Sequence, residues 1–468
     1  MALALRTLEA EVGLSRFLPG ARLQGVLRRR FVRDLQRHDV LQSGEVLHLT
    51  SLGPGPAKAP FQCAVYTCGR GDLRSRLAEE LHVPSGAFRM GPQLRIPGVS
   101  VQLMTLPKGL SDKTPDEVLK SGMLKGPEFT VALGPADLAM PAAGKLRCAG
   151  HRFTMVLRGL SQKQLSTGLV EERLEEIREN GFVNFFELSH FGLAEVRRFE
   201  IGAALWGGHW ANAAHLLLTA NRADALRPAS KAFAEKDYAK GLELLPTGNS
   251  CKGLRKLAMN LLLKRPVKEA VFAALSPPDW RRYLSSVSRL AWNKAVALRL
   301  GGEMPLRPVP GDLVWDERAG EGRPVSAKEA DEDRWHLKDV VLPLPRPGSP
   351  VPESGGRLAM EAVLRDFVPT EDSTELPELK EFIPSVRHIL SVPADLTWDV
   401  DEGMVDCDLV RLGLAEMPRG RAIRAETVAL RLRATLRRTE SAEALLREVL
   451  KANPSDFQEG LDREDEVF

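Results

Sequence analysis

The stretch from residue 181 to residue 192 reads Gly-Phe-Val-Asn-Phe-Phe-Glu-Leu-Ser-His-Phe-Gly. It follows a charged segment, 171–179, whose spacing predicts a helix, and Asn180 and Gly181 are typical of a helix C-terminus. The stretch holds four phenylalanines, a residue type that is most often buried: Phe182, Phe185, Phe186 and Phe191. We therefore expect most of this stretch to lie in a hydrophobic core.

The composition is that of a folded chain with room for one large or two ordinary domains. The chain has 468 residues, of which 43% are hydrophobic and 27% charged. A net charge of +3 supports nucleic-acid binding only weakly, so such binding would require a local basic face on the protein. The cysteines show no Cys-x-x-Cys pair and no zinc-like spacing with histidine, which favours reduced thiols in an intracellular protein and no metal site; they are Cys63, Cys68, Cys148, Cys251 and Cys407. No apolar run approaches the roughly 20 residues of a membrane span, so we expect no membrane partner.

The two ends of the chain have a biased composition. Residues 1–30 contain six arginines and only Glu9 and Glu11 as acids. Two interpretations of the extension 1–21 stay open, a transit segment for an organelle and a leading helix before a basic strand. The acidic tail, 454–468, is expected to be disordered. We predict an intracellular protein, either mitochondrial or, as the alternative, cytoplasmic or nuclear.

Between the ends, helical and strand-like patterns follow each other without a regular βαβ rhythm, which favours an α+β fold. Alternating apolar and polar residues predict strands at 26–31, 33–40, 61–67, 99–104, 151–158, 312–315, 340–344 and 427–432. Helical spacing predicts helices at 72–81, 171–179, 195–221, 254–274, 283–300 and 440–453. Proline and glycine predict loops at 53–60 and in much of 301–357.

The opening stretch resembles the signature of the TruD-type pseudouridine synthases, Gly-Phe-x-Asn-Tyr-Phe-Gly-x-Gln-Arg-Phe-Gly. The residues that match include Asn184, Phe186, Phe191 and Gly192, and those that do not are Glu187, Ser189 and His190. Further segments resemble motifs of the family in the family's order: 33–39, 150–158, 200–210, 290–294, 339–345 and 445–450. A single short match is weak, but an ordered series is not. The chain is therefore similar to a eukaryotic-like member of this family.

This resemblance implies a two-part architecture. A pseudouridine synthase domain, with a central antiparallel sheet flanked by helices, would use residues 22–195 and 396–453. A TruD-specific α+β domain would be inserted at 196–395. The resemblance also implies structured RNA, either tRNA or rRNA, as the partner and no cofactor, and proteins of a ribonucleoprotein are further candidate partners.

The chain departs from the family at the motif that carries the chemistry. In the family an aspartate in Gly-x-Lys-Asp-Arg-x-Ala-x-Thr-x-Gln acts as nucleophile or base on a uridine that has left its helical stack. Residues 88–102 align with this motif without a gap, which places Leu94 at the lysine and Arg95 at the aspartate. A guanidinium stays protonated and is no nucleophile, although it can bind a phosphate. We therefore predict a catalytically degenerate member.

Other parts of the same pocket depart from the family as well. His151 replaces an asparagine, residues 134–140 replace a basic run, and 436–443 lacks the glycine turn and tyrosine of the last motif. One alternative nucleophile is Asp112, because 109–113 superficially resembles another form of the catalytic motif. The neighbouring residues 115–117 favour a helix start there instead.

The residues that we predict to contact RNA are Arg95, Asn184, Phe186, His190, Arg437 and Arg438. Stacking of a base on Phe186 would contribute about 1–3 kcal/mol, with core packing as the alternative, and a lone histidine such as His190 is more often structural. The arginines would clamp phosphates around the former active site. Three functions follow. The first is an inactive RNA-binding structural or assembly component of a ribonucleoprotein, an organelle ribosome among them. The second is an active synthase acting on tRNA, rRNA or mRNA, and the third is a protein-interaction scaffold without RNA contact.

Overall fold

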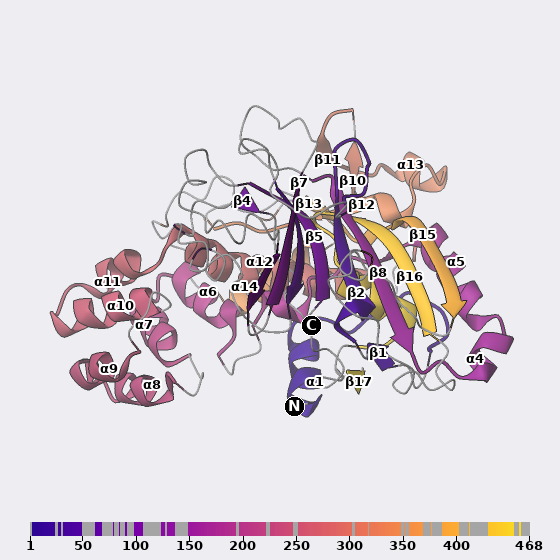
Figure 1. Cartoon of the computed structure of the whole chain (residues 1–468). Coiled ribbons are helices and arrows are strands. Elements are labelled where there is room, and N and C mark those ends of the chain that lie inside the picture. The colour runs from indigo at the N-terminus through magenta and orange to yellow at the C-terminus, as the bar shows by residue number, and fades with distance from the viewer. Residues whose placement is uncertain are drawn as a thin grey trace. The chain divides into compact units, whose positions relative to one another are not determined.

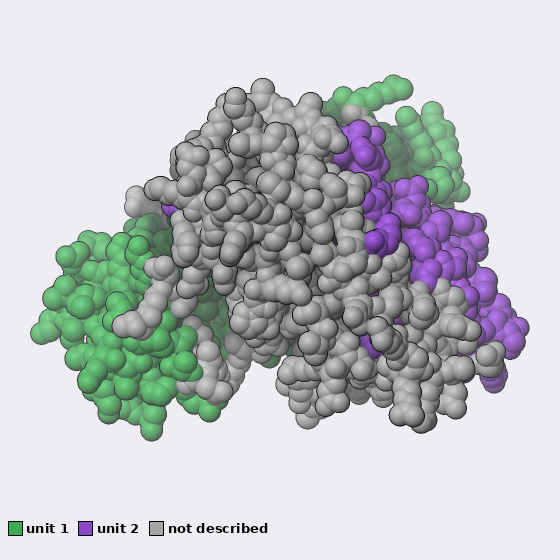
Figure 2. Space-filling model, in the orientation of Figure 1, with its two compact units in different colours: residues 1–19, 182–391 green, residues 20–181, 392–468 purple. Residues whose placement is uncertain are grey.

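A computed structural model of the chain describes residues 2–23, 27–29, 31–48, 61–67, 78, 84, 89–90, 98–105, 123–126, 129–135, 148–192, 196–220, 225–246, 251–301, 305–316, 318–347, 351, 354, 356–367, 376, 386–401, 411, 429–453 and 458–459. The chain forms two compact units (Figure 2). Unit 1 comprises Met1–Pro19 and Phe182–Ser391, and unit 2 comprises Gly20–Gly181 and Val392–Phe468. Each unit is therefore built from segments that are distant in the sequence.

Unit 2 is built on one sheet, which has 11 strands in the described part of the chain. Its main path runs β15-β16-β8-β2-β5-β3-β7-β6 (Figure 1). The strands are β1 Leu27–Arg29, β2 Leu35–Val40, β3 Phe61–Thr67, β4 Arg89–Met90, β5 Gly98–Thr105, β6 Met123–Gly126, β7 Phe129–Pro135, β8 Gly150–Arg158, β15 Ala394–Asp401, β16 Ala429–Arg437 and β17 Gln458–Glu459. Neighbours pair antiparallel, except β2 with β5 and β1 with β17, so the expected central antiparallel sheet is confirmed.

Alternation along the strands gives this sheet a buried and a polar face. On β16 the buried side chains are Leu430, Leu432, Ala434 and Leu436, and those between them are partly exposed. Helix α5 (Leu169–Asn180) lies on the buried face, because the Arg178 guanidinium stands 5.2 Å from the ring of Trp398, which pairs with Leu432. Helices α4 (Gln162–Ser166) and α16 (Ala442–Leu450) contact α5. The opposite face of β16 carries its partly exposed side chains.

Unit 1 is mainly helical. Its helices are α1 Ala2–Glu11, α6 Arg198–Trp206, α7 Trp210–Thr219, α8 Arg227–Ala234, α9 Tyr238–Leu244, α10 Lys252–Leu262, α11 Val267–Ala274, α12 Pro277–Gly301, α13 Ala327–Asp331 and α14 Arg357–Phe367. A sheet of order β11-β10-β12-β13 and a pair β9-β14 complete it, with β9 Phe182–Val183, β10 Leu313–Asp316, β11 Glu321–Pro324, β12 Val340–Pro343, β13 Val386–His388 and β14 Leu390–Ser391. Helix α12 runs through the core, where Trp292 is fully buried. The α+β fold class is thereby confirmed.

Two long helices that the sequence predicts are each broken into two. The segment 195–221 divides into α6 and α7 at Gly207 and Gly208, and Gly208 has a φ of +69°, which favours glycine. The segment 254–274 divides into α10 and α11, because Lys264 takes a φ of +56° and Pro266 lacks the backbone N–H that a continuous helix needs. Periodicity thus found the helices but not their ends.

The units divide the chain at points other than those expected from the family. Residues 182–195 belong to unit 1, because Phe182 and Val183 pair with β14. The first 19 residues also belong to unit 1, where Leu8, Val12 and Leu14 are buried. Within the acidic tail, residues 458 and 459 form β17, whose backbone pairs with β1.

Several expectations fall outside the described residues. They are the loop 53–60, all but residue 78 of the helix 72–81, and the segments that hold Arg95 and Asp112. None of the described helices has both the length and the apolar character that crossing a bilayer requires.

Candidate nucleic-acid interface

The signature residue Asn184 lies in unit 1, where only 3% of it is exposed. Its side-chain amide donates a hydrogen bond to the backbone oxygen of His388 (3.2 Å), and its Oδ1 accepts one from Arg387 (2.5 Å). Arg387 also donates to the backbone oxygen of Asn184, with Nη2 at 2.9 Å. These bonds join the signature to β13 and satisfy polar groups that burial would otherwise penalise.

Phe186 is 7% exposed and is surrounded by side chains of unit 1. The rings of Trp292 and His190 meet it edge-on at 5.3 and 5.5 Å, and the Arg387 guanidinium stands 4.1 Å from its centroid. Its backbone N–H donates to Asn293 Oδ1 (2.9 Å), and Asn293 Nδ2 donates to its carbonyl oxygen (3.0 Å). Of the two roles that the sequence left open for Phe186, these contacts support core packing. His190 is half-buried, and its edge-on contact with Phe186 supports a structural role for this histidine as well.

Unit 2 holds a corresponding buried pair made by two other motif segments. Arg158, at the end of β8, donates to both carboxylate oxygens of Asp34, at 2.9 and 2.6 Å. Asp34 also accepts from the backbone N–H of Phe31 (2.9 Å), and the Arg158 guanidinium lies 4.8 Å from the Phe31 ring. Both charged side chains are at most 3% exposed to water. Each buried charge is therefore stabilised by the opposite charge of its partner.

A cavity of about 750 Å³ opens on the polar face of the unit 2 sheet. Its lining residues come mainly from β2, β8, β15 and β16, and are Gln36, His38, Val46, His48, Arg152, Thr154, Asp395, Arg411, Arg431 and Arg433. The strand register places Gln36 beside Thr154 and Thr154 beside Arg433, so three strands present one continuous surface. Four arginines and one aspartate line the cavity, which makes it a positively charged site.

Three of the four arginines of this cavity pair with two aspartates. Arg152 pairs with Asp395 (3.5 Å). Asp399 accepts a hydrogen bond from Arg433 (2.6 Å) and forms an ion pair with Arg431 (3.2 Å). Burial lowers the pKa of Arg152, the Asp395 carboxylate partly offsets this, and the nearby charge of Arg433 lowers it further. The positive charges of Arg152 and Arg433 therefore repel each other in this cavity. A bound anion would reduce this repulsion.

The predicted RNA contacts are divided between the two units. Arg437 and Arg438 are exposed at the end of β16 in unit 2, whereas Asn184, Phe186 and His190 belong to unit 1. Arg95 lies outside the described residues. The arginines of the cavity were not predicted as site residues, although Arg431 and Arg433 alternate with leucines along one strand, a period-two signal.

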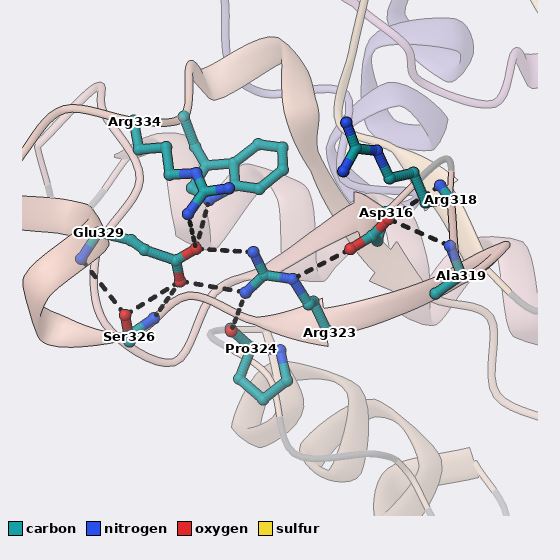
Figure 3. Close-up of polar contacts among 9 residues, drawn as sticks. Asp316, Arg318, Ala319, Arg323, Pro324, Ser326, Glu329 and Arg334 are labelled. Atoms are coloured by element: carbon teal, nitrogen blue, oxygen red, sulfur yellow. Dashed lines mark hydrogen bonds and ion pairs between the residues drawn. The ribbon is translucent and has the colours of Figure 1, made fainter.

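In a second polar cluster, on the β10–β11 hairpin of unit 1, the charged side chains pair with one another (Figure 3). Arg323 bridges Asp316 (3.4 Å) and Glu329 (2.6 Å), and Glu329 also accepts from the backbone N–H of Ser326 (3.2 Å). The bond from Arg323, followed by that from Ser326, holds the pKa of Glu329 far below its ordinary value. Because each oxygen of Glu329 already has donors, we assign this cluster a structural role.

Comparison with known proteins places this geometry in a family. A model described as tRNA pseudouridine synthase D (TruD) matches residues 98–381. The chain belongs to the TruD family. A solved structure of a Methanosarcina mazei protein assigned to TruD has a TM-score of 0.61 at 16% identity, covering 96% of this chain and 99% of that one. At this identity the likeness establishes the pseudouridine synthase fold alone.

Among curated TruD relatives, the mouse Pseudouridylate synthase 7 homolog is 28% identical over 205 residues, which is 42% of this chain and 29% of that protein. The mouse Pseudouridylate synthase PUS7L is 30% identical over 268 residues, or 53% of this chain and 38% of the relative. The bovine Pseudouridylate synthase 7 homolog is 26% identical over 266 residues, or 54% and 38%. The aligned part of the chain therefore spans well under half the length of these relatives.

Other residues of the TruD-like motifs also hold the fold. Glu200 accepts a hydrogen bond from the backbone N–H of Arg197 (2.7 Å) and thereby caps α6. At Gly202 a Cβ atom would stand 2.2 Å from the carbonyl oxygen of Tyr283, so only glycine lets α6 approach α12 this closely. The motif residues that this chain shares with the family thus include many that are needed for packing.

Proposed function

We propose that this TruD-family protein binds structured RNA without isomerising uridine, as a structural or assembly component of a ribonucleoprotein. The observation that carries this proposal is Arg95 at the position of the family's catalytic aspartate. A guanidinium cannot act as the nucleophile or base that the reaction needs. The match to the family model begins at residue 98, so the stretch that holds Arg95 lies outside it.

The distribution of retained and replaced residues supports loss of chemistry with retention of the fold. Retained motif residues such as Asp34, Asn184 and Asn293 make buried hydrogen bonds. The replaced positions, Arg95 and His151 among them, fall in motifs that the resemblance assigns to the reaction pocket. This pattern is expected when stability remains under selection and catalysis does not.

The arginine-lined cavity of unit 2 supports RNA as the ligand. Arginine presents a planar fork of N–H donors that matches phosphate oxygens, and aspartate pairing has already oriented several of these forks. Gln36 and Thr154 on the same surface add polar groups for sugars or bases. We assign tRNA and rRNA as the RNA classes to be tested, at this cavity and at Arg437 and Arg438.

An active pseudouridine synthase is the second candidate, because the curated relatives are named as such enzymes. It would need another carboxylate as nucleophile, for which Asp112 is the candidate that the sequence offers. Since the aligned part covers only 29% of the mouse Pseudouridylate synthase 7 homolog, the activity of that whole protein is not carried over.

Tritium release from RNA carrying 5-tritiated uridine separates the two candidates. The wild type, Arg95→Asp and Asp112→Asn are compared on unfractionated tRNA and rRNA, with binding of each RNA measured in parallel. We expect binding without release for the wild type. Release by the wild type that disappears in Asp112→Asn would establish the enzyme. Absence of RNA from ultraviolet crosslinks would instead favour a protein scaffold.

The compartment belongs to the same proposal. We place the protein inside the cell, with a mitochondrial ribonucleoprotein, such as an organelle ribosome, as the first assembly to examine and the cytoplasm and nucleus as alternatives. Fractionation of cells that express the chain with a C-terminal tag, followed by sequencing of the copurified RNA, distinguishes these locations.

A further inference from the structure

Three side chains that are distant in the sequence meet where β2 and β8 adjoin in unit 2. Asp39 lies near the end of β2 and His151 near the start of β8, and the two face each other in the antiparallel pairing. Cys148 lies just before β8. The Cys148 sulfur, a ring nitrogen of His151 and an Asp39 oxygen all lie within 4.8 Å of one another. Asp39 and His151 are 4% and 6% exposed, and Cys148 is half-buried.

This set of donors has the chemistry of a transition-metal site. Thiolate sulfur, imidazole nitrogen and carboxylate oxygen are the three donor types that zinc takes in proteins, whereas calcium and magnesium prefer oxygen alone. Asp39 Oδ1 and His151 Nδ1 are 3.1 Å apart, a hydrogen-bond distance. Donor atoms around a tetrahedral zinc stand about 3.5 Å apart, so shifts of about an ångström would form the site.

We propose that Asp39, Cys148 and His151 bind a zinc ion or a similar borderline divalent metal, with water as the fourth ligand. The ion would join the end of β2 to the start of β8 and to the segment before it. This inference does not depend on whether the protein isomerises uridine. In the family motif the position of His151 is an asparagine, so the site would be a property of this chain rather than of the motif.

The charges around the cluster set the expected strength of binding. Arg37 and Arg438 both interact electrostatically with Cys148. Burial and the Asp39 carboxylate raise the pKa of the Cys148 thiol, and the charges of Arg438 and Arg37 offset this only in part. The two positive charges also oppose a cation. With three protein ligands and two nearby guanidinium groups, we expect weaker binding than at structural zinc sites with four protein ligands.

Cobalt is the probe, because a cobalt–thiolate bond gives a charge-transfer band in the near ultraviolet and a tetrahedral site gives intense visible bands. The full chain is stripped with a chelator under reducing conditions, dialysed and titrated with cobalt and then with zinc. We compare the wild type with Cys148→Ser and with His151→Asn, which restores the family's residue. Cys251→Ser, at a buried cysteine of unit 1, is the matched control.

We expect one cobalt per chain and a charge-transfer band that zinc abolishes. The band should be lost in Cys148→Ser and unchanged in Cys251→Ser. In His151→Asn the apparent affinity should fall at least tenfold, since loss of a ligand's outer-shell partner alone typically costs about 10–100-fold. Zinc should also protect Cys148 of the wild type from alkylation, which mass spectrometry measures without any variant. A band that persists in Cys148→Ser, or no band and no protection in the wild type, would overturn the proposal.

Discussion

Asn293 connects helix α12 to the signature stretch through two hydrogen bonds to the backbone of Phe186, at 2.9 and 3.0 Å. The side chain of Asn293 is fully buried, so removing its amide leaves both an N–H and a C=O group without a partner. We predict that Asn293→Ala lowers the free energy of unfolding by about 3 kcal/mol, because each buried unpaired group costs about 1–3 kcal/mol. Urea unfolding followed by circular dichroism measures the change.

The matched control for this prediction is Asn212→Ala, an exposed asparagine on α7. Alanine favours a helix over asparagine, so we expect this variant to unfold at the same or a slightly higher urea concentration. Equal midpoints for Asn293→Ala and the wild type would mean that water replaces the lost amide, and the structural role of this motif residue would have to be abandoned.

The motif residues could be predicted from the sequence, but their partners in the fold could not. Asn184 could be predicted as important from its place in the signature. Its partner Arg387 is 203 residues away, and no local pattern indicates that the two side chains meet. The same holds for Asp39 and His151, since only strand pairing brings residues 112 positions apart into contact. The buried partners of a motif therefore require the fold.

At the scale of elements, Arg323 and Glu329 join the β10–β11 hairpin to helix α13. Bonds from Arg323 and Ser326 lower the pKa of Glu329 below its ordinary value of 4.5. A carboxylate with a depressed pKa contributes stability that is complete above its ordinary pKa and is lost as the pH falls toward its folded value. We therefore predict that Glu329→Gln destabilises unit 1 at pH 7 and that the difference from the wild type shrinks below about pH 4.

Thermal unfolding of both proteins between neutral pH and the onset of acid unfolding tests this prediction. Glu321→Gln, at an exposed glutamate of the same hairpin, is the control and should follow the wild type throughout. If the difference in melting temperature between Glu329→Gln and the wild type stayed constant across this pH range, the substitution would act by changing local packing and not by removing the ion pair.

Helix α1 is an integral part of the unit 1 core. Leu8, Val12 and Leu14 are at most 3% exposed and share a cluster with Trp292. At Gly13 a Cβ atom would stand 3.0 Å from the backbone nitrogen of Lys294, so the chain also touches α12 directly. This packing makes α1 part of the folded unit 1.

We predict that Leu8→Ala lowers the free energy of unfolding by about 3 kcal/mol, a typical cost of emptying a buried leucine site. Deletion of residues 1–19 should expose the apolar surface that α1 covers, and we expect aggregation. Ala10→Ser, at an exposed position of the same helix, serves as the control for Leu8→Ala. If the deletion variant melted like the full chain, the segment would be dispensable, as a transit segment is.

At the scale of the whole molecule, the fold class could be predicted because the motifs occur in the order of the family. The resemblance also implied a domain formed by 22–195 and 396–453 around an insertion, and unit 2 combines 20–181 with 392–468. The sequence did not predict that residues 1–19 and 182–195 join residues 196–391 in unit 1. Such assembly depends on contacts such as those between Leu8 and the core around α12 and between β9 and β14. Periodicity within short windows carries no information about these contacts.

The positively charged cavity of unit 2 is the site at which we propose that RNA binds. Each arginine that neutralises a phosphate releases a counterion, so it adds to the steepness with which affinity falls as salt rises. We predict that Arg431→Gln combined with Arg433→Gln weakens binding of unfractionated tRNA about tenfold at low salt. The same double variant should reduce the slope of log affinity against log salt by about 1 to 2.

Fluorescence anisotropy across a salt series measures both quantities. Arg318→Gln, an exposed arginine in the β10–β11 turn of unit 1, removes a surface charge outside the cavity and should leave the slope unchanged. If that control and the double variant lowered affinity equally, attraction would come from the overall charge of +3 and not from this cavity. A lower affinity with an unchanged salt slope would instead mean that the arginines contact bases or hold the cavity open, because only phosphate contacts release counterions.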